Sequence, residues 1–269
     1  MARKEPWTRR KWGGAPWWGW VLIATGVTAA IIALVIGGTR SIAPIASSSA
    51  VDQSILTTPD ELPPLQIPDA GVKITAFGDS WTQGYSATPE TLGYAYLTIR
   101  HLGGVANVLG AGGTGYNNPG TSNSNAGTYE QRLNALPVDA DTKLLILQGG
   151  LNDLKHTPTD YGQIVSRTIG LAKRKFPNAQ VVVVGPAPSQ IGEVGGLKPI
   201  SQAIWTAAND NDVYYVPPID LRWINSDNIS SIIDPTTKHP STQGHATIAT
   251  DLEGALAKLA QGGSQALFS

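Results

Sequence analysis

Short apolar runs alternate with amphipathic segments along most of the chain after residue 70. The apolar runs have the length and the Val, Ile, Leu and Tyr content of buried strands. They cover residues 72–79, 105–111, 143–150, 179–187 and 213–220. Helical patterns lie between and after them, over residues 91–102, 127–136, 158–175, 198–208 and 242–260. This alternation predicts right-handed βαβ units, which build an α/β fold around a parallel five-stranded sheet.

The N-terminal part of the chain has a different pattern. No charged residue occurs between Lys11 and Arg40, and apolar side chains dominate residues 17–38. About twenty helical residues span about 30 Å, the thickness of the hydrocarbon core of a bilayer. We therefore predict one transmembrane helix over 17–38, preceded by a basic segment over 1–16. A cleaved signal peptide, whose apolar core is normally shorter, and a buried core helix are the alternatives.

Charge is segregated along the sequence, although the formal net charge is only −1. The first twenty residues hold five basic residues and one acidic residue, whereas residues 41–269 hold thirteen basic and nineteen acidic residues. Basic residues before an apolar span predict a cytoplasmic N-terminus and an exported C-terminal region. The lack of a basic excess beyond the span argues against nucleic acid as a partner. The absence of cysteine excludes a disulfide framework, a thiolate metal site and a cysteine nucleophile.

Residues 39–70 are rich in Ser, Pro, Thr and Ala and follow no helical or strand period. This composition predicts an extended linker between the membrane and a single domain over residues 71–269. A domain of roughly 200 residues is large enough to bury its own core.

Polar residues and glycines follow several of the predicted strands. Ser80 follows the first strand, a glycine cluster at 110–115 follows the second, and Asn152 follows the third. His239 precedes the last predicted helix. The carboxyl ends of parallel strands share one edge of the sheet, and ligands bind there. A serine hydroxyl needs a nearby base to act as a nucleophile, and a histidine, which titrates near neutral pH, suits that role.

Three sequence blocks carry a family resemblance: AFGDSWTQG at 76–84, GGLND at 149–153 and KHPSTQGHATIA at 238–249. Over residues 72–255 the chain resembles the SGNH hydrolases, also called GDSL esterases and lipases. The resemblance implies a flavodoxin-like three-layer α/β/α sandwich and a serine ester hydrolase that needs no metal or organic cofactor. It implies Ser80 as the nucleophile, His239 as the base, and an oxyanion hole. The donors of that hole would be the backbone N–H groups of Ser80 and Gly113, with Gly112 as the alternative glycine, and the Asn152 side chain.

The acidic member of the expected catalytic triad departs from the family pattern. The family usually places an aspartate three residues before the histidine, but Thr236 stands at that position. The nearest acid is Asp234, so we expect its carboxylate to orient the His239 ring. Asp227, or no acid at all, are the alternatives.

Residues near the predicted rim are candidates for substrate contacts. Trp81 follows the nucleophile and either fills the core or lines the acyl pocket. Tyr116 and Asn117 lie in a polar, glycine-rich segment over 112–127, and we expect them to contact a sugar or another polar acyl acceptor. The cluster at 110–115 also matches the G-x-G-x-x-G dinucleotide fingerprint. Turn residues rather than a helix follow it, so we do not expect nucleotide binding.

Together these features predict a membrane-anchored, extracytoplasmic serine ester hydrolase that works through an acyl-enzyme. The polar loop favours short acyl esters, such as O-acetyl groups of envelope glycans, or small soluble esters. One alternative is an acyltransferase that passes the acyl group to a sugar hydroxyl. Another is a catalytically silent glycan-binding module on the same fold. Secretion after signal cleavage is the alternative localisation.

Overall fold

The computed structural model describes residues 11–12, 15–16, 62–120 and 126–263. The chain divides into two units, Met1–Thr57 and Thr58–Ser269. In the first unit two short strands, β1 (Lys11–Trp12) and β2 (Ala15–Pro16), pair in antiparallel fashion. The predicted transmembrane segment 17–38 lies outside the described residues. Among the helices that are described, none is long and apolar enough to cross a membrane.

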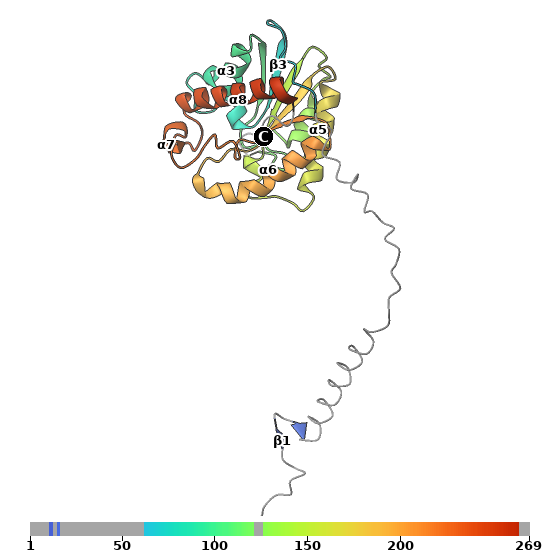
Figure 1. The fold of residues 1–269 in the computed structure, drawn as a ribbon, viewed down its shortest axis with the longest axis vertical. Coiled ribbons are helices and arrows are strands. Elements are labelled where there is room, and N and C mark those ends of the chain that lie inside the picture. Colours follow the sequence, from blue (N-terminus) through green and yellow to red (C-terminus); the bar gives the residue numbers. More distant parts are fainter. Residues whose placement is uncertain (1–10, 13–14, 17–61, 121–125, 264–269) are drawn as a thin grey trace, which may run out of the picture. The chain divides into compact units, whose positions relative to one another are not determined.

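The second unit is built on a parallel sheet of five strands (Figure 1). The strands are β3 (Lys73–Gly78), β4 (Val105–Gly110), β5 (Leu144–Gln148), β6 (Gln180–Val184) and β7 (Tyr214–Val216). Their spatial order is β4-β3-β5-β6-β7, which confirms the predicted five-stranded parallel sheet. The chain pairs β4 on one side of β3 and then β5 on its other side. The order therefore reverses at β3, and such sheets bind ligands at the carboxyl end of that strand.

Helices cover both faces of the sheet and complete the predicted three layers (Figure 1). The first face carries α2 (Ser80–Gln83), α3 (Tyr94–His101), α7 (Ile229–Ile232) and α8 (Thr242–Gly262). The second face carries α4 (Tyr129–Ala135), α5 (Tyr161–Lys175) and α6 (Val194–Asn209). Three short 3-10 turns are η3 (Glu90–Leu92), η4 (Leu151–Asp153) and η5 (Ile191–Glu193). Side chains alternate along each strand, so Ala76 packs into the core of the first face and Phe77 into that of the second.

Helix α6 begins four residues before its predicted start at residue 198. Gly195 and Gly196 lower the helix propensity of this first turn, which is why the sequence pattern does not reveal it. Leu197 and Ile200 are buried in the core of the second face, so packing outweighs local propensity there. Helices α2 and α7 are four residues each, too short to show a hydrophobic period.

The predicted linker extends to residue 70, but its last part, residues 62–70, packs along the domain. Leu65 is buried, and its N–H donates to the Leu259 carbonyl at 3.0 Å. The Tyr214 hydroxyl donates to the Pro63 carbonyl at 2.8 Å. These partners are distant in sequence and the segment has no regular period, so the hydrophobic pattern did not predict its packing. The rest of the predicted linker, 39–61, lies outside the described residues.

His245 joins α8 to the segment between α2 and α3. The ring is fully buried; Nδ1 accepts a hydrogen bond from the Tyr94 N–H at 3.2 Å, and Nε2 donates to the Tyr85 carbonyl at 3.1 Å. The Tyr94 ring lies nearly parallel to it, with the ring centroids 6.3 Å apart. An imidazole that accepts at one nitrogen and donates at the other is neutral. Burial accordingly lowers the pKa of His245 to about 4.

This lowered pKa predicts a pH dependence of stability. An unfolded histidine titrates near 6.5, so the contribution of His245 is fully present above that pH and is lost as pH falls towards 4. The lost stability amounts to roughly 3 kcal/mol at most. The substitution His245→Gln keeps one donor and one acceptor but cannot become charged. We expect the stability advantage of the wild type over the variant to shrink between about pH 7 and about pH 4.5. Urea unfolding of both proteins at several pH values measures the difference in their free energies of unfolding. A difference that does not change with pH would refute this role of His245.

Candidate active site

Ser80 and His239, which lie far apart in the sequence, form a hydrogen-bonded pair. Ser80 Oγ lies 2.8 Å from His239 Nε2, and His239 Nδ1 lies 2.7 Å from the Thr237 carbonyl oxygen. A carbonyl oxygen can only accept, so Nδ1 carries the ring proton. The lone pair of Nε2 therefore faces the Ser80 hydroxyl. This is the geometry in which an imidazole acts as general base for a serine nucleophile.

The position of Ser80 follows from the tight connection between β3 and α2. Asp79 caps α2, since its carboxylate accepts from the Trp81 N–H at 2.8 Å. Gly78 approaches β5 so closely that a Cβ atom there would lie 2.9 Å from the Gln148 carbonyl oxygen. Only glycine fits this approach without movement of the strand. Ser80 thus begins α2, where backbone N–H groups have no acceptor within the helix.

His239 stands at the end of a loop that closes on itself. Ile233 and Pro240 form an isolated bridge, and the Asp234 N–H donates to the His239 carbonyl at 2.8 Å. Lys238 adopts a φ of 59°, which is unfavourable for a residue with a side chain. The surrounding bonds hold this strained residue directly before the catalytic ring.

The Asp234 carboxylate stabilises this loop instead of orienting the imidazole. It accepts the backbone N–H groups of Thr236 at 2.7 Å and Thr237 at 3.1 Å, which lower the pKa of the Asp234 carboxyl. The prediction of Asp234 as the triad acid is therefore corrected: the Thr237 carbonyl holds the ring. Asp227, the alternative acid, lies in an exposed turn, where Ser226 Oγ donates to its carboxylate.

A buried carboxylate connects the nucleophile to the predicted oxyanion residues. Asp79 Oδ2 accepts from Gln148 Nε2 at 3.2 Å and from Asn152 Nδ2 at 3.4 Å. Asn152 Nδ2 also donates to the Thr114 carbonyl at 2.9 Å. Burial raises the pKa of Asp79 to about 6, and the N–H group of Trp81 and the amide of Gln148 oppose that rise. The carboxylate is thus a shared acceptor for groups from α2, β5 and η4.

The predicted glycine donors also lie at this edge. A Cβ atom on Gly112 would lie 3.9 Å from Ser80 Cβ, and Gly113 has a φ of 73°. Ser80, the Gly112–Gly113 turn and Asn152 thus surround the same end of β3. Their role in stabilising an oxyanion stays a prediction. The described residues contain no group of three or more His, Asp or Glu side chains that could hold a metal ion.

The structure places two of the three predicted substrate-contact residues, Trp81 and Tyr116, in the core, whereas a substrate contact of Asn117 stays a prediction. Trp81 is 4% exposed and packs in the core of the first face, and Tyr116 is 1% exposed and packs in that of the second. Both side chains are therefore too deeply buried to form the predicted contact. Asn117 holds its loop, since its N–H donates to Asp153 Oδ1 at 2.9 Å and its side chain donates to the His156 carbonyl at 3.0 Å.

Sequence reasoning missed Tyr85, which lies against the catalytic histidine. The two ring centroids are 4.7 Å apart at an interplanar angle of 62°, and Tyr85 is 45% exposed. The neighbouring Ser86 hydroxyl donates to Thr237 Oγ1 at 2.8 Å, which ties this segment to the histidine loop. The sequence does hold a sign of this position, because Tyr85 is an aromatic residue that directly follows Gly84, the last residue of the block at 76–84.

Arg132 of α4 was also missed, because its partners are mostly backbone atoms. Nη1 donates to the Gly78 carbonyl at 2.7 Å and to Thr114 Oγ1 at 2.8 Å, and Nη2 donates to the Leu109 carbonyl. The guanidinium lies 4.2 Å from the centroid of the Phe77 ring. Burial lowers the pKa of Arg132. The residue supports the ends of β3 and β4 from the second face of the sheet.

Comparison with known families agrees with this geometry. The sequence pattern of the GDSL-like lipase/acylhydrolase family matches residues 76–247, more than half of the chain. The chain belongs to this family. No curated protein sequence matches it. Membership together with the Ser80–His239 pair makes the chain a serine ester hydrolase of the SGNH type.

Several solved structures of this fold are similar to the chain. A family two carbohydrate esterase from Clostridium thermocellum, in complex with cellohexaose, has 20% identity and a TM-score of 0.53. That match covers 71% of this chain and 66% of the other. A phospholipase A1 from Streptomyces albidoflavus has 16% identity and a TM-score of 0.55, covering 69% and 99%. A carbohydrate acetylesterase family member from Sinorhizobium meliloti has 15% identity and a TM-score of 0.51, covering 71% and 99%. At these identities the likeness shows the fold alone.

The role of Asp234 in this GDSL-type hydrolase can be tested with Asp234→Asn. We expect kcat for 4-nitrophenyl acetate to stay within about threefold of wild type, because asparagine accepts backbone N–H groups about as well as aspartate. Had the carboxylate oriented the ring, the loss would be on the order of 10³–10⁴. The control Asp234→Ala removes the acceptor, releases the turn that carries the Thr237 carbonyl, and should be slower than the asparagine variant. A loss of about 10³ in Asp234→Asn would restore the triad interpretation.

Proposed function

We propose that this serine ester hydrolase removes short acyl groups, such as O-acetyl groups, from carbohydrate. The observation that carries the proposal is the 2.8 Å contact between Ser80 Oγ and the unprotonated Nε2 of His239. A catalytically silent binding module does not need a serine that is hydrogen-bonded to a general base, so this contact argues against that alternative.

In the proposed reaction, Ser80 Oγ attacks the ester carbonyl carbon while its proton passes to His239 Nε2. Collapse of the tetrahedral intermediate breaks the bond to the alcohol, and His239 returns the proton to the departing oxygen. Water then gives a proton to Nε2 and attacks the acyl-enzyme. The second tetrahedral intermediate collapses, Ser80 Oγ departs and takes the proton back from Nε2, and the carboxylic acid is released. The Thr237 carbonyl keeps Nδ1–H in place through both steps.

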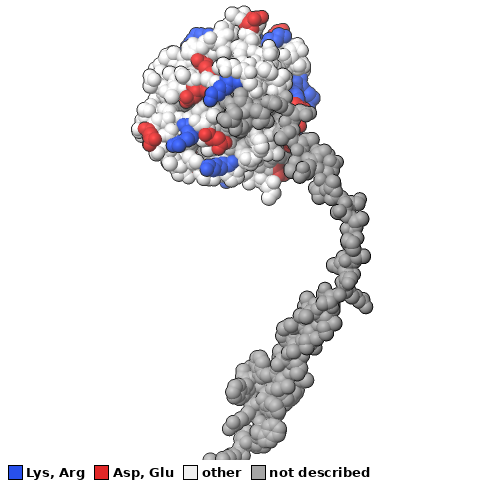
Figure 2. Space-filling model, in the orientation of Figure 1, with Lys and Arg blue, Asp and Glu red and all other residues white. Residues whose placement is uncertain are grey.

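Four features support a small acyl group on an uncharged polymer. Trp81 and Tyr116 are packed into the core and leave no acyl channel at their positions. On the face drawn in Figure 2, side chains of both charges are interspersed, which suits a neutral substrate better than a polyanion. The similar structures include a carbohydrate acetylesterase family member and an esterase active on acetylated mannans. The exposed ring of Tyr85 adds an aromatic surface beside His239.

Hydrolysis of 4-nitrophenyl acetate, butyrate and octanoate by the full chain tests the proposal. We expect acetate to be the best substrate and Ser80→Ala to lower kcat by at least roughly 10⁴. The control Ser231→Ala changes an exposed serine on α7 and should match wild type. Equal activity of Ser80→Ala and wild type would remove Ser80 from the mechanism. Preference for octanoate would overturn the short-chain assignment, and transfer to an added oligosaccharide in place of hydrolysis would identify an acyltransferase.

We also propose that residues 17–38 anchor the chain in a membrane, with the catalytic domain outside the cytoplasm. The length of the uncharged apolar stretch and the basic residues before it support this. The expected result is a full chain that sediments with membranes and is released by detergent but not by salt. Deletion of residues 1–38 should release the domain. Recovery of the full chain in the soluble fraction would contradict the anchor, and a shortened chain in the medium would indicate a cleaved signal.

A further inference from the structure

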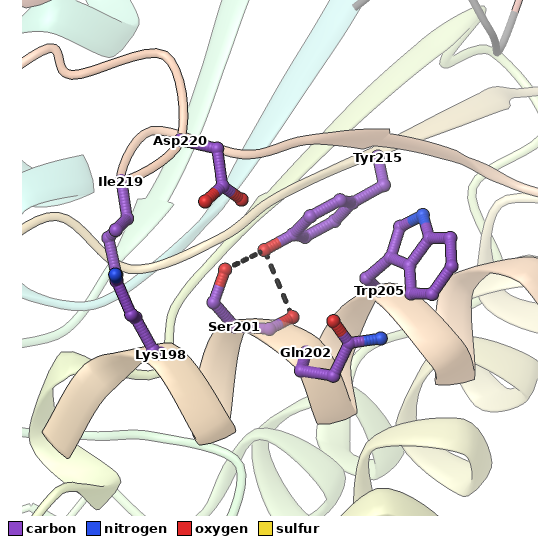
Figure 3. A pocket seen from close by; sticks show the side chains of 7 residues that line it. All are labelled: Lys198, Ser201, Gln202, Trp205, Tyr215, Ile219 and Asp220. Carbon is purple, nitrogen blue, oxygen red and sulfur yellow. Dashed lines mark hydrogen bonds between the residues drawn. The ribbon is translucent and has the colours of Figure 1, made fainter. Parts of the chain in front are cut away.

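A hollow opens between α6 and the segment that follows β7, and neither Ser80 nor His239 lines it (Figure 3). Its volume is about 330 Å³. An adjoining cavity of about 420 Å³ shares Lys198, Ile219 and Asp220 with it, so the two form one groove. Each volume lies within the range of small-ligand sites, about 300–1,000 Å³. The groove belongs to no part of the catalytic site described above.

One face of α6 supplies half of the first cavity. Lys198, Gln202 and Trp205 are spaced so that they line the same side of the helix, together with Ser201. Asp220 comes from the opposite wall, and its carboxylate points into the cavity towards the hydroxyls of Ser201 and Tyr215 (Figure 3). Lys198, Gln202 and Asp220 are exposed, so their polar groups are accessible to a ligand.

This set of groups matches the chemistry of a sugar residue. The indole of Trp205 offers a flat apolar surface for the carbon-bound hydrogens of a pyranose ring. The Asp220 carboxylate accepts hydrogen bonds from hydroxyl groups, and Lys198 and Gln202 donate to them. The opposite charges of Lys198 and Asp220 balance in the first cavity, which favours a neutral ligand there over a phosphate or a polyanion. The adjoining cavity also carries Arg222.

The groove lies at the same edge of the sheet as the nucleophile. Ser80 follows β3, and β7 lies three strand positions away through β5 and β6. With about 4.8 Å between neighbouring strands, the strands that precede the two sites are separated by roughly 15 Å across the sheet. An oligosaccharide of a few units spans such a distance, so one glycan chain can occupy both sites.

We propose that the groove between α6 and the β7 loop is a distal carbohydrate subsite, which binds neutral sugar units of a polymer whose acyl group lies at Ser80. The choice of a glycan rests on the proposed function, but binding itself needs no catalysis. Occupation of this subsite gives affinity for the polymer in addition to the contacts at the ester. It also selects polymeric substrates over small esters.

The subsite is tested by measuring oligosaccharide binding to the full chain with the substitution Ser80→Ala, which prevents turnover of the ligand. Cellohexaose, mannohexaose and the hexamer of N-acetylglucosamine are titrated by isothermal calorimetry. We expect at least one of them to bind, and Trp205→Ala or Asp220→Ala to weaken that binding by roughly tenfold or more. Asp220 is exposed, so Asp220→Ala keeps the test valid if the tryptophan variant does not fold. Thermal unfolding verifies the fold of each variant.

Two glutamines provide the matched control. Gln202→Ala changes the proposed subsite, whereas Gln163→Ala changes an exposed glutamine at a different cavity, between α5 and α6. We expect only the first to weaken binding. Failure of all three hexasaccharides to bind, or binding that none of the groove variants weakens, overturns the subsite. The wild type could hydrolyse no ester while the chain still binds a hexasaccharide through the groove. That result would support the subsite and refute the proposed function. Failure of the subsite and failure of the proposed function are therefore distinguishable.

Discussion

The buried carboxylate of Asp79 organises the catalytic end of the sheet. A buried charge costs several kcal/mol unless polar groups surround it. The partners of Asp79 are the Trp81 N–H and the side-chain amides of Gln148 and Asn152, which belong to α2, β5 and η4. Burial raises the pKa of Asp79 to about 6, and the Trp81 N–H and the Gln148 amide oppose that rise by favouring the ionised carboxylate. Satisfying this single charge fixes the turn that carries Ser80 relative to the loop that carries Asn152.

The ring of His239, the proposed base, is positioned by a backbone carbonyl rather than by a carboxylate. The Thr237 carbonyl fixes the tautomer of His239 as an acid would, but it carries no net charge to stabilise the imidazolium. Correct placement therefore depends on the closed loop before His239, and Asp234 acts on that loop through two backbone N–H groups. Ser86 holds the same loop from the α2 side. The base is thus oriented by several weak local bonds.

Much of this architecture was predictable from local patterns. The alternation of apolar runs and helices predicted the sheet, and three sequence blocks at strand ends indicated Ser80, Asn152 and His239. The prediction for Asp234 was wrong because the spacing shows only that a carboxylate is near, not which donor it meets. The Asp234 carboxylate binds two backbone N–H groups within three residues of it, and not the His239 ring. For Trp81 the sequence allows either the core or the acyl pocket, because local sequence does not tell which face of a short helix is buried.

The sequence by itself determined the strand–helix order and the types of residue available for chemistry, because both depend on backbone geometry over a few positions. Tertiary structure decided which of these residues meet. The contact between Ser80 and His239, the support of the strand ends by Arg132 and the groove between α6 and β7 all join segments that are distant along the chain. Such contacts depend on how loops close and how layers pack. Loop closure and layer packing depend on which partners all the buried groups find together, and a pattern over a few residues does not contain that information.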